Sequence, residues 1–317
     1  MNQCNGFFSS GEIGAEAEEF FRQQGYLVVK KALSAGQLEQ LLRETVSLAR
    51  GKLGPVEGMP DSSAAESDDG VLGKILCVHQ PHKISPLLRS MVNLPPILEV
   101  LTRVIGPNVK CMQSMLFIKA AGKPGQAWHQ DEDYIPTRDR SLTGAWIAMD
   151  DATVENGCLW VIPGSHRAGI LWPQYPHADP RFDCARESYD FPHRDEDAVP
   201  VEVSAGSIVF FNGYLLHRSL PNKAASGYRR CLVNHYMSAE SLLPWFTAAT
   251  MPKEAGAALA DYRDIILVAG NDPYAWKGTL DIARPKIRPA GEGGCGDGRL
   301  TLQEHKALQT AKPAAKA

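Results

Sequence analysis

Three residues of metal-binding type stand at a spacing that an iron site can use. His129 and Asp131 form a His-x-Asp pair, and His217 follows 88 residues after His129 (217 minus 129). Two imidazoles and one carboxylate cover one face of an octahedral ion and leave its other positions open for a co-substrate and O2. The pattern predicts a mononuclear non-haem Fe(II) site, with these three residues as the catalytic centre.

An arginine beyond the second histidine indicates the kind of co-substrate. Arg229 lies 12 residues after His217 (229 minus 217), in a strand-like run. A guanidinium inside a barrel is costly unless an anion meets it. A dicarboxylate such as 2-oxoglutarate can accept two parallel hydrogen bonds from it. Arg230 would point to the opposite face of the same strand, and we prefer Arg229 as the anchor.

The elements that carry these residues are predicted strands. In the run 126–131, residues i and i+2 face the same way, so His129 and Asp131 would point into a barrel and Gln130 would point out of it. His217 follows a second predicted strand that ends in a turn. A histidine that opens a polar segment there is better placed to coordinate a metal than to pack in a core.

The order of predicted elements gives a mainly β fold with flanking helices. The N-terminal part, 15–106, is largely helical, with a helix over 15–24, a strand over 26–30 and a helix that starts at Ser34 in a capping box with Gln37. Short strands separated by turn residues dominate afterwards, which is typical of an antiparallel sandwich or barrel. They are predicted over 109–119, 126–131, 143–150, 158–162, 199–203, 207–212 and 228–237.

We predict one oxygenase domain over 1–288, with the barrel core over 107–245 and a C-terminal extension over 246–288. Residues 289–317 begin with several glycines and are expected to form a mobile tail. The stretch 168–198 interrupts the barrel without a clear period, and an insertion of that kind is more often functional than idle. Trp128, Tyr134, Trp172, Tyr175 and this insertion are predicted to line the substrate pocket.

Composition excludes several classes of protein. The 317 residues are 44% hydrophobic and 22% charged, and the formal net charge is -3, so nothing indicates a nucleic-acid binder. No apolar stretch is long enough to span a bilayer. The seven cysteines include no C-x-x-C, which favours a reducing, cytoplasmic location over a disulfide framework or a zinc ribbon. The expected partner is a small-molecule substrate.

Four blocks of the sequence resemble one known family in the same order. They are QSMLFIKAAGKPGQAWHQD at 113–131, GAWIAMDDATVENGCLWVIPGSHR at 144–167, GSIVFFNGYLLHRSLPN at 206–222 and GYRR at 227–230. Over residues 15–245 the chain is similar to the phytanoyl-CoA dioxygenase family of Fe(II)/2-oxoglutarate oxygenases. The resemblance implies a double-stranded β-helix, or jelly-roll, core of the cupin type.

The same resemblance implies how the site is filled. Iron would be held by His129, Asp131 and His217. The co-substrate 2-oxoglutarate would touch Lys74, Met115, Trp146, Ser219 and Arg229, and Gln113 could also reach it. The spacing from His217 to Arg229 is one residue longer than is usual in the family.

The implied reaction is hydroxylation of an unactivated C–H bond, with release of succinate and CO2. Related halogenases lack the carboxylate ligand, so the presence of Asp131 favours hydroxylation over halogenation. Desaturation, cyclisation and epimerisation use the same three ligands and stay open. Two rivals from other classes are a barrel that binds metal or ligand without turnover and a zinc hydrolase, which would give Arg229 no role.

Overall fold

Two facing sheets and a layer of helices make up the computed structural model, which describes residues 6–177, 179–183, 186–242 and 261–289. The larger sheet has the strand order β1-β2-β11-β6-β13-β4-β3-β15, and β14 pairs with β4. The smaller sheet has the order β10-β7-β12-β5, and β8 and β9 form a separate hairpin. All pairings within these sheets are antiparallel except that of β1 with β2.

The strands are β1 (Phe7–Ser9), β2 (Tyr26–Lys30), β3 (Ile75–His79), β4 (Val109–Ala120), β5 (Gln126–His129), β6 (Thr143–Ala148), β7 (Leu159–Val161), β8 (Gln174–Tyr175), β9 (Glu187–Ser188), β10 (Val199–Val201), β11 (Ile208–Asn212), β12 (His217–Ser219), β13 (Tyr228–Ser238), β14 (Ile266–Ala269) and β15 (Lys286–Pro289). The α-helices are α1 (Ala15–Gln24), α2 (Ala35–Ala49), α3 (Asp68–Gly73), α4 (Pro86–Ser90), α5 (Pro95–Val104) and α6 (Asp131–Tyr134). Short 3-10 helices are η1 (Pro81–Lys83), η2 (Met91–Asn93), η3 (Ser165–Ala168), η4 (Asp195–Asp197) and η6 (Ala275–Lys277).

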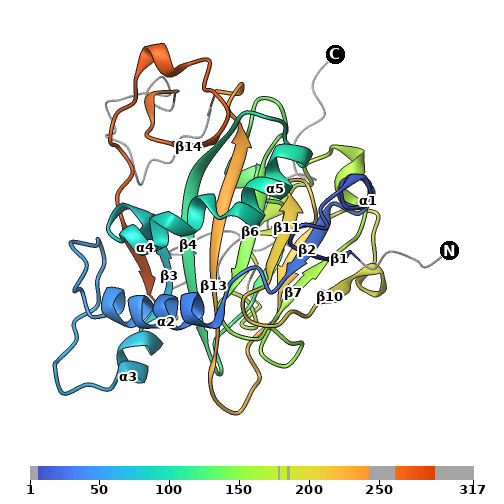
Figure 1. Cartoon of the computed structure of the whole chain (residues 1–317). Coiled ribbons are helices and arrows are strands. Elements are labelled where there is room, and N and C mark those ends of the chain that lie inside the picture. Colours follow the sequence, from blue (N-terminus) through green and yellow to red (C-terminus); the bar gives the residue numbers. More distant parts are fainter. Residues whose placement is uncertain (1–5, 178, 184–185, 243–260, 290–317) are drawn as a thin grey trace, which may run out of the picture.

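Alternation along the strands of the larger sheet divides two apolar cores. On β13, Leu232 faces the helical layer and packs in one cluster with residues of α1, α2 and α5. Its neighbours Cys231 and Val233 belong to the other cluster, which also contains Val161 and Val201 of the smaller sheet. The helices therefore cover the outer face of the larger sheet (Figure 1), and the second cluster fills the space between the two sheets.

Several predictions of local structure are confirmed. The helix over 15–24 and the strand over 26–30 lie as expected, and Ser34 caps α2 in a reciprocal capping box with Gln37. The predicted mainly antiparallel β class with flanking helices is also confirmed. The strand predicted over 126–131 is too long, because β5 ends at His129 and the next residues form the single turn of α6.

The larger sheet reaches beyond the predicted barrel core. Strands β1, β2 and β3 join it from the N-terminal part, and β14 and β15 join it from the C-terminal extension. The domain boundaries stay a prediction. The first part of the expected extension (246–260) and nearly all of the expected tail (290–317) lie outside the described residues. In the part that is described, no helix is long and apolar enough to cross a membrane.

The insertion over 168–198 packs on the outside of the smaller sheet. The Trp128 ring meets Phe191 edge-on at 6.3 Å between centroids, and its Nε1 donates to Asp195 at 3.2 Å. Asp195 also accepts from Arg218, whose guanidinium lies 4.4 Å from the centre of the Trp128 ring. Trp128 therefore faces the insertion, and its place in the substrate pocket stays a prediction.

Gly125, directly before β5, lies too close to β12 to carry a side chain. A Cβ atom added to Gly125 would lie 1.9 Å from the backbone oxygen of Ser219. We expect Gly125→Ala to lower the free energy of unfolding by about 1–3 kcal/mol, because the backbone of β12 must move. Differential scanning fluorimetry of the metal-free protein measures this as a lower melting temperature.

Gly36→Ala is the matched control, since Gly36 lies in α2 with no atom within 4 Å of the added Cβ. It should leave the melting temperature unchanged or raise it, as alanine favours helix. Equal melting temperatures for the two variants would contradict the close contact at Gly125.

Candidate metal centre

Strand pairing brings the two distant histidines together. In the smaller sheet His217 of β12 stands directly opposite His129 of β5. The centroids of the two imidazole rings are 4.0 Å apart, and both side chains are buried. The separation of 88 residues in the sequence is thus one cross-strand pair in the structure.

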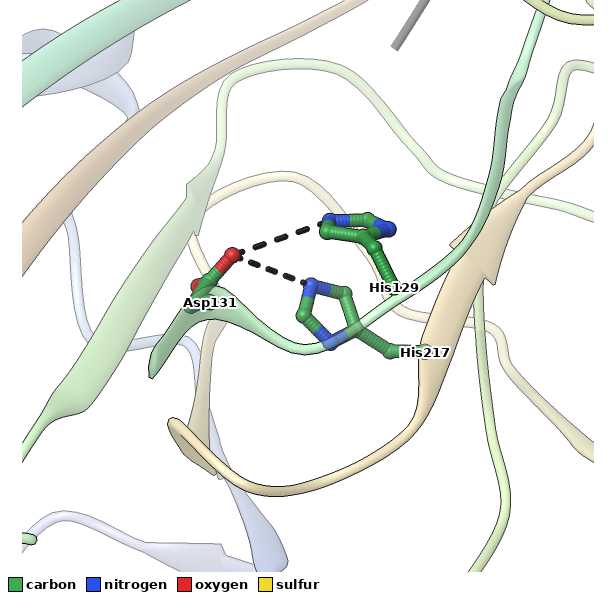
Figure 2. A group of neighbouring side chains, drawn as sticks. All are labelled: His129, Asp131 and His217. Carbon is green, nitrogen blue, oxygen red and sulfur yellow. Dashed lines mark ion pairs between the residues drawn. The ribbon is translucent and has the colours of Figure 1, made fainter. Parts of the chain in front are cut away.

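Asp131 completes the group from the turn that follows β5. Its Oδ1 atom lies 3.6 Å from Nε2 of His129 and 3.6 Å from Nε2 of His217 (Figure 2). Asp131 is the first residue of α6, so the helical turn and not a continued strand directs its carboxylate to the histidines. The three donor atoms lie within 4.8 Å of one another, close enough to surround one ion.

Gln130 explains why the strand ends where it does. This residue is fully buried, and its side-chain amide donates to the carbonyls of Ile170 and Tyr214. Its Oε1 accepts the backbone N–H of Trp172. Gln130 thus points away from the metal ligands, as expected, and the start of the insertion covers it and fixes the turn to Asp131.

Backbone hydrogen bonds fix the histidine tautomers. Nδ1 of His129 lies 2.8 Å from the carbonyl of Ala127, and Nδ1 of His217 lies 2.9 Å from the carbonyl of Leu215. A carbonyl only accepts, so each Nδ1 carries a hydrogen, and each Nε2 faces Asp131. Burial, and then the neighbouring His217, lowers the pKa of His129 to about 3, which keeps this ring neutral near pH 7.

A third histidine, which sequence reasoning missed, holds the other oxygen of the carboxylate. Nε2 of His235, on β13, lies 3.0 Å from Oδ2 of Asp131 and donates to it. Burial favours the protonated acid, yet the pKa of Asp131 lies below its ordinary value because His217, His235 and His129 surround it. Alternation from Arg229 along β13 would have placed His235 on the inner face.

Two cations lie side by side on the inner face of the larger sheet. Arg229 of β13 pairs in register with Lys119 of β4, and both side chains are buried. Nζ of Lys119 donates to Oγ of Ser219 at 2.9 Å and to the carbonyl of Leu220 at 2.7 Å. Burial, and then the charge of Arg229, lowers the pKa of Lys119 well below its ordinary value.

Neither cation forms an ion pair with a carboxylate of the described residues. Arg229 donates through Nη1 to the thiol sulfur of Cys231 at 2.9 Å, its Nε is buried without a partner, and its guanidinium lies 5.4 Å from the centre of the Trp146 ring. Arg230, on the opposite face, is bound through Nε and Nη2 by Asp150 at 2.8 and 2.7 Å. The two adjacent arginines therefore differ, because only Arg230 has its counter-charge.

The other predicted contacts divide into two groups. Met115 and Trp146 lie on the inner face of the larger sheet, where Trp146 is part of the core between the sheets and Met115 packs against it. Gln113 pairs in register with His235 and donates to the sulfur of Met115 at 3.0 Å. Lys74 lies apart, since its Nζ binds Glu66 at 2.8 Å and the carbonyl of Asp61 at 2.7 Å.

Comparison with known proteins decides the family. The model of the family "Phytanoyl-CoA dioxygenase (PhyH)" matches residues 21–231, which is more than half of the 317 residues. The chain belongs to the phytanoyl-CoA dioxygenase family. It is a non-haem iron, 2-oxoglutarate-dependent dioxygenase, and the family that the sequence resembles is confirmed. The rival interpretations as a binding barrel or a zinc hydrolase are thereby set aside.

Individual relatives agree with the family match. A phytanoyl-CoA dioxygenase of Arabidopsis thaliana is 27% identical over 280 residues, which covers 77% of this chain and 97% of the relative. Among solved structures, the apo form of the non-haem monooxygenase ThoJ matches with a TM-score of 0.60 at 20% identity, over 93% of this chain and 94% of that one.

The epimerase SnoN in complex with Fe3+, α-ketoglutarate and nogalamycin RO matches with a TM-score of 0.57 at 21% identity, over 85% of this chain and 96% of that one. These structural matches bear on the fold, and they confirm the double-stranded β-helix.

The described residues fit the iron and the 2-oxoglutarate that the family uses. Two imidazoles, each bound through Nδ1 to a backbone carbonyl, and one carboxylate lie close together, which is the donor set that Fe(II) uses. Arg229 and Lys119, which form no ion pair with a described carboxylate, lie in the same barrel and suit an anionic oxo-acid.

We expect His235→Phe to weaken Fe(II) or Co(II) binding by about 10- to 100-fold, because Oδ2 of Asp131 loses its donor. Anaerobic titration of the metal-free variant by calorimetry measures the affinity directly. His235→Gln, which can still donate a hydrogen bond, should recover part of the loss.

His82→Phe is the control for the removal of a buried histidine, since His82 bonds Ser114 and not a metal ligand. Metal affinity should be unchanged in this variant. Equal affinities for wild type and His235→Phe would show that His235 does not position Asp131.

Proposed function

We propose that this dioxygenase hydroxylates an unactivated C–H bond of a small-molecule substrate. One oxygen atom of O2 enters the product alcohol, and the other enters succinate as 2-oxoglutarate loses CO2. The observation that carries the proposal is the pair Arg229 and Lys119, two buried cations without a carboxylate of their own among the described residues, in the barrel that holds the metal ligands. Bound at the triad, iron supplies the activation of O2.

The residues around this pair form the proposed anchor of the co-substrate. The Arg229 fork would bind the carboxylate of 2-oxoglutarate that is remote from the metal, and Lys119 would add a second charge-assisted hydrogen bond. Ser219 already accepts from Lys119 and keeps its hydroxyl hydrogen for the same carboxylate. Trp146 packs against the guanidinium and limits where it can lie.

Three further contacts stay predictions. We propose that Met115 and Gln113 form the wall beside the keto-acid end, since Gln113 pairs in register with His235 next to the metal ligands. Contact of Lys74 with 2-oxoglutarate would require its ammonium to leave Glu66 and Asp61. We therefore expect Lys74 to contribute least to the binding of 2-oxoglutarate.

The protein's other contribution is to hold the ligands and exclude water. His129, His217 and Gln130 are buried, and the insertion covers the turn between His129 and Asp131. Such enclosure protects an oxidising centre from side reactions. Asp131 occupies the coordination position that a halide would need, which favours hydroxylation over halogenation.

Desaturation, cyclisation and epimerisation use the same three ligands, and analysis of the product distinguishes them from hydroxylation.

We propose a reducing, cytoplasmic location, because Cys77, Cys111, Cys158 and Cys231 are buried free thiols.

The first experiment is an anaerobic titration of the metal-free protein with Fe(II) and then with 2-oxoglutarate. Chelation of the oxo-acid at the metal should give a weak visible charge-transfer band. Succinate release in the presence of O2 then serves as the screen for substrates. A folded protein that binds Fe(II) but gives no band with 2-oxoglutarate would overturn the proposed site.

The two adjacent arginines give a matched pair of variants. We expect Arg229→Ala to raise the concentration of 2-oxoglutarate needed for half-saturation by about 10- to 100-fold, because charge-assisted hydrogen bonds to the co-substrate are lost. Arg230→Ala should change it little, because Asp150 and not the co-substrate binds that side chain. The opposite ranking would move the anchor to Arg230.

Lys119→Met tests the second cation with a side chain of similar length. Half-saturation by 2-oxoglutarate should shift to a concentration about 10-fold higher, and Fe(II) affinity should stay as in wild type. Calorimetric titration with Fe(II) measures the metal affinity, and the charge-transfer band then measures the affinity for 2-oxoglutarate. Unchanged 2-oxoglutarate affinity would show that Lys119 serves only to bind Ser219 and Leu220.

A further inference from the structure

A cavity lies outside the barrel, behind the turn that leads to His217. Its volume is about 540 Å³, and its walls come from α1, the C-terminal end of α5, η3 and the turn after β11. Helices α1 and α5 lie side by side at this corner of the molecule (Figure 1). A cavity of this size is large enough for a small-molecule ligand.

The charge of the cavity walls is strongly one-sided. Arg22, Arg103, Arg140 and Arg167 line it, and Glu18 is the one acidic residue among the lining side chains. Arg22 is paired with Glu19. The other three arginines, all exposed, form no ion pair with a carboxylate of the described residues, so a bound anion would supply their counter-charge.

Arg140 is an exposed residue whose backbone conformation and ring contact limit where its side chain can lie. Its backbone is in the left-handed region, with φ of 61°, which a non-glycine residue adopts only when local structure requires it. Its guanidinium lies 5.6 Å from the centre of the Tyr214 ring. A Cβ atom on Gly169 would lie 2.7 Å from Nη1 of Arg140, so the absence of a side chain there allows this approach.

The wall that carries Tyr214 is held by hydrogen bonds to the turn that contains Asp131. The carbonyl of Tyr214 accepts from Nε2 of Gln130 at 2.7 Å, and the carbonyl of Gly213 accepts the backbone N–H of Glu132 at 3.0 Å. The turn that carries Tyr214 is therefore fixed without a ligand, and a preformed cavity loses less entropy when it binds one.

We propose that this cavity binds the phosphate groups of a small molecule. Guanidinium groups bind phosphate oxygens through paired hydrogen bonds, and several arginines around one cavity match the multiple negative charges of a diphosphate better than a single carboxylate. The Tyr214 ring gives an apolar surface beside these charges. This site goes beyond the proposed function, because it uses neither the metal nor 2-oxoglutarate.

Calorimetric titration of the metal-free protein with inorganic pyrophosphate tests the proposal. We expect saturable binding of pyrophosphate. Its affinity should fall by about 10-fold in Arg140→Ala and in Arg167→Ala, because each variant loses one charge-assisted hydrogen bond. Arg140→Lys should lie between wild type and Arg140→Ala. Citrate, a polyanion without phosphate, should bind more weakly than pyrophosphate.

Two control variants separate this site from others. Arg89→Ala removes an exposed arginine on α4 that is distant from the cavity, and it should leave pyrophosphate affinity unchanged. Arg229→Ala should also leave it unchanged, so failure of the proposed 2-oxoglutarate site would not affect this result. Absence of saturable binding, equal affinity in wild type and Arg140→Ala, or citrate binding as tight as pyrophosphate would each overturn the proposal.

Discussion

The cross-strand pair of His129 and His217 is the contact on which the site depends. Successive side chains of a strand face opposite ways, so a shift of one residue in the pairing of β5 with β12 would present Arg218 in place of His217. The outer face of the same strands prevents that shift. Arg218 is held between Trp128 and Asp195, and this arrangement would be broken if the register moved.

The polar side chains around the metal ligands on the inner face of the barrel form hydrogen bonds. His129 and His217 use Nδ1 for backbone carbonyls, and His235 gives a hydrogen to Asp131. Arg229 stands out among them, because its nearest acceptor is a neutral thiol. A buried guanidinium with so weak an acceptor is expensive in the free protein, which is a physical reason for an anionic co-substrate to bind there.

The insertion over 168–198 acts as a support as well as a cover. Its first residues bind Gln130, and its later residues pack on Trp128 and Arg218. Both contacts lie on the side of β5 and β12 that faces away from the metal ligands. The same region therefore stabilises the turn to Asp131 and the register of the two histidines, and the cavity rich in arginine lies beside this support.

Much of the chemistry was determined by the sequence alone, because ligand types and strand alternation are local properties. His129, Asp131 and His217 were identifiable from residue type and order, and the alternation of β13 already separated Arg229 from Arg230. The same alternation places Lys119 and His235 on the inner face, but it does not show which side chain each of them contacts there.

Only the tertiary structure decided which charges are compensated. Asp150 binds Arg230 from 80 residues away in the sequence, Glu66 binds Lys74, and no carboxylate of the described residues binds Arg229. The end of β5 at His129 was likewise set by Ile170, Trp172 and Tyr214, which lie far along the chain. Such partners are brought together by packing in three dimensions, and a local sequence pattern does not predict them.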